Sequence, residues 1–438
     1  MPLAQGEVPE KIRLLNTAWR MRLRTGFAMS DVFRVKKWLS SLAFLLLCSS
    51  AFAQLQEVTS GVAYELIGTY DVARLNQILT QELKEFSDFP VSYPPAKYGV
   101  KLYRINYPSV IPEQENRPTV ASGLLAVPER EAREMPVISY QHGSVFPKNE
   151  VPSHPDESME TRLMLAQFAG QGYLVVAADY FGKGESQEKD SYLVKASTQQ
   201  ACLDHLKACQ AVSTHLKLTW GPLFLSGWSQ GGWATLVFLK KLEEVGIPVK
   251  AAATASAPTD LFAMINGWIH APTDHDASFL PALMALQINA YAEYHRLPGL
   301  DESAFRPEYR QTARKLYLNE MTWAQASPLL PKTLSELLRE DFIAAGSVGN
   351  ARYWQILQDS QAYRWRSITP LRTYYGQADE VTSPYIATLP VGFQKATGGA
   401  ETTGVDAGVK ANHRGTFLYA VADQKKWFDE MLRDKSEN

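Results

Sequence analysis

Residues 225–232 read LSGWSQGG, and this stretch decides how the fold is interpreted. It contains the pattern G-x-S-x-G, in which a serine stands on a sharp turn between a strand and a helix. The context fits, because an apolar strand is expected at 222–229 and a helix at 230–246. Small residues must flank so tight a turn, and the glycines supply them. Ser229 is therefore the candidate nucleophile. The alternative, an incidental serine in a glycine-rich turn, is disfavoured because motif and context agree.

Short apolar strands alternate with helices on both sides of this motif. The expected strands cover 99–107, 118–128, 135–143, 173–182, 222–229 and 249–258. The expected helices cover 160–171, 196–217 and 230–246, with a further helix at 69–86 that precedes the first strands. Alternation of this kind indicates a mostly parallel central sheet with helices on both faces, so the predicted fold class is α/β.

The alternation stops after residue 258. The helical patterns that follow are clearest at 280–295, 333–345 and 351–365, and the last expected elements are a strand at 370–376, a weak strand near 403–411 and a helix at 415–433. We therefore predict a core formed by residues 54–258 and 369–438, interrupted by a helical lid insertion at 259–368. A lid inserted there would cover the carboxyl ends of the strands, where open α/β sheets place their sites.

Residues 1–53 are expected to be an N-terminal extension and a secretory signal peptide. A basic segment precedes the apolar run at 39–47, and the small-x-small sequence AFA follows it. This order is typical of a peptide cleaved after Ala53. The apolar run is shorter than the ~20 residues that span a membrane, so no stable membrane insertion is expected after cleavage. The predicted location is secreted or periplasmic, and the translation start stays open between Met1 and Met29.

Composition and cysteine usage narrow the classes of function. The 438 residues are 45% hydrophobic and carry a net charge of −2, which does not indicate a nucleic-acid partner. Cys202 and Cys209 both fall in the expected helix at 196–217. Seven residues of helix span about 10.5 Å, whereas the Cα atoms of a disulfide lie within about 7 Å. We therefore predict no intrachain disulfide and two small buried side chains.

A serine nucleophile needs a base, and the base needs an orienting acid. In enzymes that carry this elbow, the acid and then the histidine follow the serine along the chain. Asp379 follows the expected strand after the lid, with Glu380 and Asp406 as competing acids. His413 is the only histidine after Asp379 in the sequence, and it is expected on a loop before the last helix. Asp379 and His413 are therefore the predicted partners of the serine.

Acyl transfer also needs N–H donors for the oxyanion that forms in the transition state. The residue after the nucleophile and a loop after an earlier strand supply them in this arrangement. The backbone N–H groups of Gln230 and Ser144 are the expected donors. His142 and Asp179 could each be interpreted as catalytic, but bracing the loops through hydrogen bonds is the preferred role for both.

A polar cluster within the predicted lid raises the question of a metal. It consists of His270, Asp274, His275 and Asp276. The sequence contains neither an H-E-x-x-H pattern nor a pair of C-x-x-C patterns, so an exposed loop is the preferred interpretation. No metal and no cofactor are expected.

Several stretches resemble the secretory lipase/esterase branch of the α/β-hydrolases, particularly bacterial secreted esterases. They are ASGLL at 121–125, SYQHGSVF at 139–146, ADYFGKGES at 178–186, LSGWSQGG at 225–232, and the late Asp379 and His413. The resemblance covers about 60–430 and implies an α/β-hydrolase fold with a helical lid. It also implies a secreted carboxylic-ester hydrolase that forms an acyl-enzyme from a small-molecule, lipid or polysaccharide ester. Trp228 stands where relatives often carry tyrosine. The lid does not match clearly, so no substrate preference is transferred.

Two other functions stay open at this point. A serine exopeptidase of the same fold would share the triad but would need a charged anchor for the peptide terminus. Glu293, Glu302 and Glu308 of the predicted lid are candidates for that anchor. A non-catalytic binding protein of this fold usually lacks a triad residue, and none is missing from this sequence.

Overall fold

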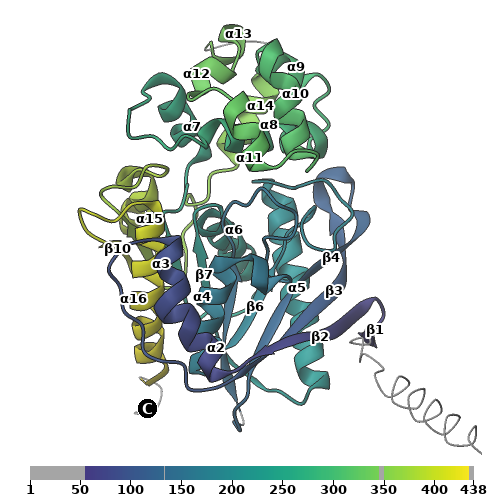
Figure 1. Ribbon diagram of the computed structural model, residues 1–438, viewed down its shortest axis with the longest axis vertical. Helices are drawn as coiled ribbons and strands as arrows, with labels where there is room; N and C mark the ends of the chain where they lie inside the picture. Colours follow the sequence, from purple (N-terminus) through teal and green to yellow (C-terminus); the bar gives the residue numbers. More distant parts are fainter. Residues whose placement is uncertain (1–54, 133, 345–349, 434–438) are drawn as a thin grey trace, which may run out of the picture. The chain divides into compact units, whose positions relative to one another are not determined.

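The computed structural model describes residues 55–132, 134–344 and 350–433 (Figure 1). The expected signal peptide and its cleavage after Ala53 lie outside these residues. No helix in the described ranges has the length and hydropathy of a transmembrane segment.

The centre of the described structure is a ten-stranded sheet with the order β1-β2-β3-β4-β6-β5-β7-β8-β9-β10. The strands are β1 (Gln56–Thr59), β2 (Val62–Tyr70), β3 (Val100–Ile111), β4 (Arg117–Pro128), β5 (Met135–Gln141), β6 (Leu174–Ala178), β7 (Trp220–Trp228), β8 (Ala251–Ala255), β9 (Leu371–Tyr375) and β10 (Thr402–Asp406). The strands β1 to β4 pair antiparallel, and β4 also pairs antiparallel with β6. All pairs from β6 to β10 are parallel. The predicted α/β class with a mostly parallel sheet is confirmed.

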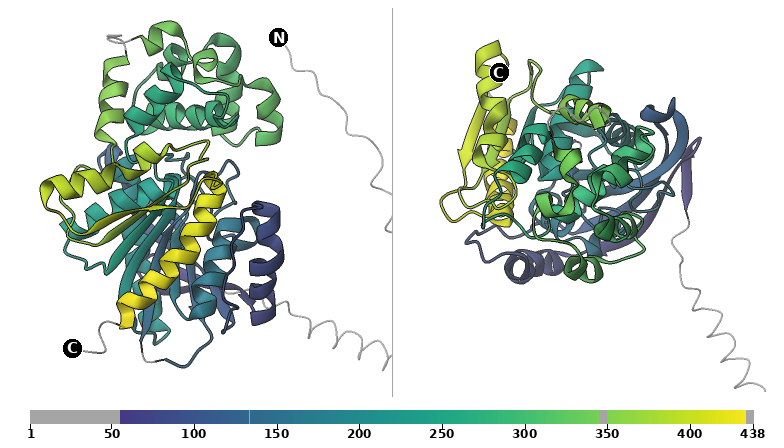
Figure 2. Two further views of the ribbon diagram at one scale, coloured as in Figure 1. Left: turned by 90° about the vertical axis from the view of Figure 1, so that its left-hand side faces the viewer. Right: turned by 90° about the horizontal axis from the view of Figure 1, so that it is seen from above.

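Helices cover both faces of the parallel strands. The helices on one face are α5 (Lys195–His215) and α6 (Gln230–Glu244), and those on the other are α4 (Met159–Gln167) and α16 (His413–Arg433) (Figure 2). Strands covered on both faces show no alternation, and β6 reads LVVAA with every residue buried. Its neighbouring side chains nevertheless enter different cores, because Val176 packs with α5 and α6 and Val175 packs with α4.

The N-terminal helical segment lies where the periodicity predicted it, but it does not precede the first strands. It consists of α2 (Val72–Gln77), the π-helical turn η1 (Ile78–Glu82) and α3 (Leu83–Phe86). Asp71 caps it by accepting the Arg74 N–H at 2.7 Å. The strands β1 and β2 come before it, which corrects the expected order. β2 reads VAYELIGTY, and its buried and exposed residues alternate too irregularly to reveal a strand.

The helices α7 to α14 lie between β8 and β9 along the chain, beyond the carboxyl ends of the parallel strands (Figure 1). We call them the cap. They are α7 (Leu261–His270), α8 (Leu280–Tyr294), α9 (Leu300–Ala304), α10 (Pro307–Tyr317), α11 (Trp323–Ala326), α12 (Leu334–Leu337), α13 (Glu340–Ile343) and α14 (Ala351–Asp359). The domain boundaries at 258 and 368 stay a prediction.

Two cap helices are shorter than expected. The expected helix at 333–345 is divided into α12 and α13, because Leu338 is extended and pairs with Phe305 in an isolated β-bridge. The expected helix at 351–365 ends at Asp359. Local periodicity does not report such a long-range bridge.

Two helices near the C-terminus also differ from the expectation. The expected elements do not include α15 (Pro384–Thr397), although the parallel strands β9 and β10 need a crossover between them. The last helix, α16, begins at His413 rather than at residue 415. The histidine therefore stands on the first turn of a helix and not on a loop.

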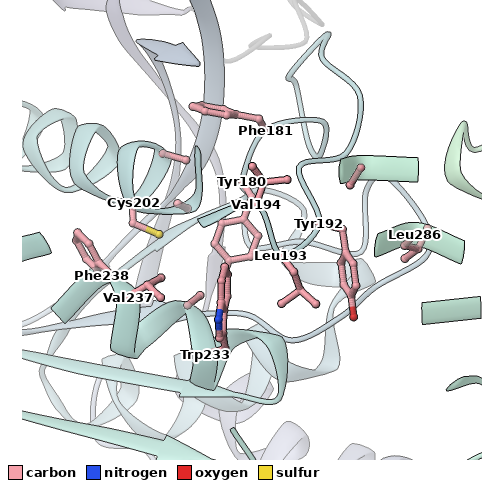
Figure 3. Packing of buried hydrophobic residues seen from close by; sticks show 14 of the residues in the cluster. Tyr180, Phe181, Tyr192, Leu193, Val194, Cys202, Trp233, Val237, Phe238 and Leu286 are labelled. Carbon is pink, nitrogen blue, oxygen red and sulfur yellow. The ribbon is translucent and has the colours of Figure 1, made fainter. Parts of the chain in front are cut away.

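The cap and the core share one apolar cluster. Figure 3 shows part of it, with Cys202 of α5, Trp233 of α6 and Leu286 of the cap helix α8 among its members. Cys202 and Cys209 are free and buried, as predicted for small hydrophobic side chains. Packing that is continuous from helix α6 to the cap holds the cap helices over the sheet.

Candidate active site

Ser229 stands at the turn between β7 and α6. Its φ of 56° and ψ of −124° lie outside the regions that residues with a Cβ usually occupy. The Ser229 N–H donates to the carbonyl of Ala255 in β8 at 2.9 Å, and α6 begins at the next residue. This strained strand-to-helix turn has the geometry of a nucleophile elbow.

The glycines of the elbow are sterically required. A Cβ on Gly227 would lie 2.2 Å from the carbonyl oxygen of Gly231, and a Cβ on Gly231 would lie 1.8 Å from that of Gln141. Both obstacles are backbone atoms, so no side-chain rotation relieves them. Around the serine, the backbone therefore packs directly against backbone, where β5 and β7 end and α6 begins.

Asp379 and His413 come into contact at the same edge of the sheet. Asp379 Oδ1 and His413 Nδ1 lie 2.9 Å apart, and both side chains are buried. The same Oδ1 accepts the N–H groups of Val381 and Thr382 at 2.9 Å each. Burial by itself raises the pKa of Asp379, but the neighbouring His413, with smaller contributions from Ser256 and the Thr382 N–H, outweighs it, so the net shift is downward. The ionised carboxylate can orient the imidazole through Nδ1, and Nε2 has no hydrogen-bond partner among the described residues.

The two competing acids have other partners. Glu380 Oε2 accepts the backbone N–H of His413 at 3.0 Å and does not contact the ring. Asp406 is exposed and accepts from Gln377 Nε2 at 2.9 Å. Of the three acids considered, Asp379 is the one that contacts the imidazole.

Trp228 holds His413 beside the elbow. Its indole N–H donates to the His413 carbonyl at 3.1 Å, and the two ring centroids are 4.9 Å apart. Among the hydrogen bonds of the described residues, none joins Ser229 Oγ to His413 Nε2. Catalytic hydrogen bonds are often long before substrate binds, and they tighten in the complex.

Ser144 and Gln230 line the same cavity as Ser229. Gln230 is the first residue of α6, so its N–H is one of the unpaired donors at the positive end of the helix. The Ser144 N–H has no acceptor among the described residues. Ser144 Oγ lies 2.6 Å from the hydroxyl of Tyr192. Both backbone N–H groups are therefore available to an oxyanion that develops in the cavity.

His142 and Asp179 brace the loops, as the sequence favoured. The ring nitrogens of His142 lie 2.8 Å from Gly143 O and 3.1 Å from Asp179 O. Burial lowers the pKa of His142 to about 4, so the neutral ring donates to one of these two carbonyls. Asp179 accepts from Ser122 Oγ at 2.5 Å and from the Ser153 N–H at 2.9 Å.

The cavity beside the nucleophile is small and uncharged. It is lined by Ser144, Tyr192, Leu193, Ser229, Gln230, Pro258, Met264, Ile265, Trp268, Leu283, Met284, Gln287, Val381 and Thr382. Its volume is about 20 Å³, little more than the roughly 10–15 Å³ that one water needs. The cap helices α7 and α8 supply its mostly apolar wall. No sequence motif marked Met264, Ile265, Leu283, Met284 and Gln287 of this wall, because their place depends on how the cap packs on the core.

The acids considered as peptide anchors do not line this cavity. Glu293 pairs with Lys189 at 2.7 Å, and Glu302 pairs with Arg310 at 3.3 Å. Glu308 is exposed. Glu293 and Glu302 are therefore paired with surface cations.

Asp274, His275 and Asp276 of the polar cluster lie on a loop, as preferred from the sequence, whereas His270 is the last residue of α7. Asp276 accepts the Thr273 N–H at 3.0 Å, and His275 Nε2 lies 3.0 Å from the carbonyl of Ala378. Nowhere in the described residues do three or more His, Cys, Asp or Glu side chains gather so as to hold a metal ion.

Comparisons with known proteins identify the fold. No protein-family model matches the chain, and no curated protein matches it. A protein from Legionella pneumophila, provisionally assigned as a hydrolase, is 22% identical with a TM-score of 0.75, and the match covers 88% of this chain and 100% of the other. The rice cell wall degrading esterase LipA from Xanthomonas oryzae is 21% identical with a TM-score of 0.69, covering 88% and 98% of the two chains.

Candida antarctica lipase A in its closed state is a more distant neighbour. It is 16% identical with a TM-score of 0.55, and the match covers 80% of this chain and 77% of the lipase. Similarity at these identities establishes architecture rather than activity. Together with the parallel strands and the elbow after β7, it shows that the chain has the α/β-hydrolase fold.

Proposed function

We propose that this chain is a carboxylic-ester hydrolase in which Ser229 is the nucleophile, His413 the base and Asp379 the orienting acid. The observation that carries the proposal is the buried 2.9 Å contact between Asp379 and His413 next to the strained elbow. Two structural neighbours are named as an esterase and a lipase, which supports the same class of reaction.

The proposed reaction is acyl transfer in two steps. Ser229 Oγ attacks the ester carbonyl while His413 Nε2 takes its proton, and the new oxyanion accepts from the N–H groups of Gln230 and Ser144. Collapse of this intermediate expels the alcohol with the proton from His413. Water then attacks the acyl-enzyme with His413 as base, and the carboxylic acid leaves. These steps use no metal and no cofactor.

The cavity supports a short, uncharged acyl group as substrate. All of its lining residues are uncharged, and its volume of about 20 Å³ is only slightly more than one water needs, which favours a short acyl group. The alcohol part stays open among small-molecule, lipid and polysaccharide alcohols. The same uncharged lining disfavours the exopeptidase alternative, because a peptide terminus would enter the cavity without an ionic partner.

Secretion is a second part of the proposal. The basic segment, the apolar run at 39–47 and the AFA sequence before Gln54 support it. N-terminal sequencing of the exported protein is expected to begin at Gln54, and an exported protein that retains the apolar run would reject cleavage.

Hydrolysis of p-nitrophenyl esters of increasing acyl length tests the proposed activity. We expect kcat/KM to be highest for acetate or propionate and to fall toward octanoate, because longer chains exceed the cavity. Aminoacyl-p-nitroanilides are expected to react far more slowly. Ser229→Ala is expected to abolish turnover.

Each other outcome has a defined meaning. Amide turnover with little ester turnover would favour the exopeptidase. Activity that survives in Ser229→Ala would reject the nucleophile. A folded protein that reacts with neither the esters nor a fluorophosphonate would favour a non-catalytic binding protein.

A further inference from the structure

The segment at 142–146 carries one of the two N–H groups that the proposed reaction uses. We call it the oxyanion loop. Oxyanion donors accelerate a reaction because they are already in place when charge develops. A loop has no helix or sheet ladder to fix its backbone, so the side chains that bond to it determine where the Ser144 N–H points.

Lys183 fastens the oxyanion loop just after Ser144. Its Nζ donates to the carbonyl of Val145 at 3.0 Å and to that of Phe146 at 3.2 Å. The same ammonium forms an ion pair with Asp190 Oδ2 at 3.1 Å. Lys183 is 3% exposed and Asp190 is 4% exposed, so this ion pair has left water almost completely.

The burial of this pair is not explained by stability alone. Removing two charges from water costs several kcal/mol, and apolar residues of similar volume often serve a core equally well. Burial raises the pKa of Asp190, which reflects the same desolvation. What the ammonium provides and an apolar side chain would not is a bond to both carbonyls of the loop.

The turn that carries Lys183 is itself fixed. Gly182 has a φ of 85°, and a Cβ there would lie 2.3 Å from the backbone nitrogen of Asp190. Gly184 has a φ of 56°, and a Cβ there would lie 2.2 Å from Asp179 Oδ2. The backbone on both sides of Lys183 therefore packs closely against Asp190 and Asp179.

Glu160 fastens the loop on the other side of Ser144. Its Oε2 accepts the Gly143 N–H at 2.8 Å and the Tyr140 hydroxyl at 2.6 Å. The peptide groups on both sides of Ser144 are thus bonded to buried ionisable side chains, while the Ser144 N–H has no acceptor among the described residues.

The cap reaches the same network. Tyr317 of α10 donates its hydroxyl proton to the backbone carbonyl of Asp190 at 3.0 Å. Phe146 of the oxyanion loop stacks on Trp323 of α11 with a centroid distance of 5.1 Å. The cap therefore contacts both Asp190, the partner of Lys183, and Phe146 of the oxyanion loop.

We propose that Lys183, held by Asp190, is a positioning residue that keeps the Ser144 N–H directed at the oxyanion. The inference rests on the proposed function, because that function makes the Ser144 N–H a donor. Lys183 acts through the loop carbonyls and touches no reacting atom. Its loss is expected to weaken binding of the transition state and not of the substrate, so kcat falls while KM stays.

Lys183→Met tests this proposal, because methionine keeps an unbranched side chain and removes the charge and the donors. Lys425→Met is the matched control. Lys425 is also buried and paired, but its partners Asp429, at 2.6 Å, and the ring of Tyr173 lie outside the oxyanion loop. Urea unfolding of both variants shows whether each is folded under assay conditions.

Two rates are measured for each folded variant. The first is p-nitrophenyl acetate hydrolysis, with kcat and KM separated. The second is labelling of Ser229 by a fluorophosphonate, in which the P–O bond forms, the P–F bond breaks, fluoride leaves, the serine proton passes to His413 and a phosphoryl oxygen gains charge at the same donors. We expect both kcat and the labelling rate of Lys183→Met to lie at least tenfold below those of Lys425→Met, with KM within twofold.

That expectation has a scale, because removing one oxyanion donor outright costs about 10²–10³ in rate. A fall of less than tenfold, or a higher KM at unchanged kcat, would overturn the proposal. If Lys183→Met does not fold, Asp190→Asn decides: we expect kcat and labelling to fall at least threefold at unchanged KM, and a smaller effect overturns the proposal.

The same measurements separate this inference from the proposed function. A wild-type protein that is labelled at Ser229 but hydrolyses no ester rejects ester hydrolysis, while the labelling rates still decide the role of Lys183. A wild-type protein that is not labelled overturns both.

Discussion

One oxygen of Asp379 organises two parts of the candidate site. Its Oδ1 lies 2.9 Å from the His413 ring nitrogen and accepts the N–H groups of Val381 and Thr382. Thr382 and Val381 in turn line the cavity beside Ser229. The carboxylate therefore aligns the proposed base and also shapes a wall of the substrate cavity.

Asp379→Asn is expected to lower kcat for p-nitrophenyl acetate by about 10³–10⁴, because an amide N–H favours the wrong imidazole tautomer. Asp406→Asn is the control, since this exposed carboxylate accepts from Gln377 Nε2 and the Gly408 N–H and does not bond to the His413 ring. We expect the control to keep kcat within twofold. Full activity in Asp379→Asn would reject Asp379 as the orienting acid. A loss of activity in Asp406→Asn would favour Asp406 instead.

Glu160 makes stability depend on pH. Burial raises its pKa from 4.5 to about 7, with Glu150 adding to the rise and Tyr140, Gly143 and His413 opposing it. The folded-state pKa lies above the unfolded value, so folding favours the protonated form. The corresponding stability is complete below about pH 4.5 and is lost as pH rises through about 7. The difference corresponds to roughly 3 kcal/mol.

Glu160→Gln removes this titration while keeping the size of the side chain. The free energy of unfolding, measured in urea at pH 4.5 and pH 8, is expected to shift in favour of the variant by up to roughly 3 kcal/mol between the two. Other titrating groups are common to both proteins and cancel. A difference between the proteins that does not change with pH would contradict the raised pKa.

At the scale of secondary-structure elements, the elbow is a junction at which the backbones of β5, β7 and α6 lie in direct contact. Gly231 is the tightest point, because a Cβ there would lie 1.8 Å from the Gln141 carbonyl oxygen. Neither strand can retreat, since β5 and β7 pair along their length. Small residues here are a property of the junction and not of the chemistry.

Gly231→Ala is expected to destabilise the fold by about 3 kcal/mol or more, because overpacking against a fixed backbone has no local remedy. Gly267→Ala in α7 is the control, since no atom lies within 4 Å of a Cβ at that position. The control should gain about 0.5–1 kcal/mol, because alanine favours a helix over glycine. Urea unfolding measures both, and equal effects would contradict the steric argument.

At the scale of the whole described structure, the cap joins the core through two neighbouring connections. Asp260 begins the first and caps α7 by accepting the Ala263 N–H at 3.0 Å. Its Oδ2 also lies 3.3 Å from Arg364 Nη2 in the second connection. A backbone bond from Ala362 to the carbonyl of Thr259, at 2.7 Å, ties the two together. An ion pair and a backbone hydrogen bond thus join the two connections between cap and core.

Asp260→Ala is expected to cost about 1–2 kcal/mol, because it removes a helix cap and a buried acceptor. Arg364→Ala should cost at most about 0.5 kcal/mol, since its side chain is 56% exposed and water screens the ion pair. Urea unfolding, together with the rate of limited proteolysis at the two connections, measures both. A larger effect of Arg364→Ala would mean that the ion pair, and not the helix cap, holds the junction.

The sequence by itself determined the parallel half of the sheet and the place of the elbow. Apolar runs such as LVVAA indicate buried strands from the local sequence alone. The glycines around Ser229 are required by steric contacts at the turn itself. Chain order singled out His413, and the position of Asp379 after the expected strand favoured it as the acid. The sequence did not reveal β2, because irregular burial hides the period of that strand. It also missed α15, although Ser383, Pro384 and Gly398 are typical signals of a helix start and end.

Only the tertiary structure decided which acid contacts the imidazole, what lines the cavity and what holds the oxyanion loop. The sequence favoured Asp379 but kept Glu380 and Asp406 as competitors, and the fold brings the Asp379 carboxylate to the His413 ring. The cap wall and the bonds from Lys183 join segments that are distant along the chain. Such contacts depend on how whole elements pack, which local composition and periodicity do not record.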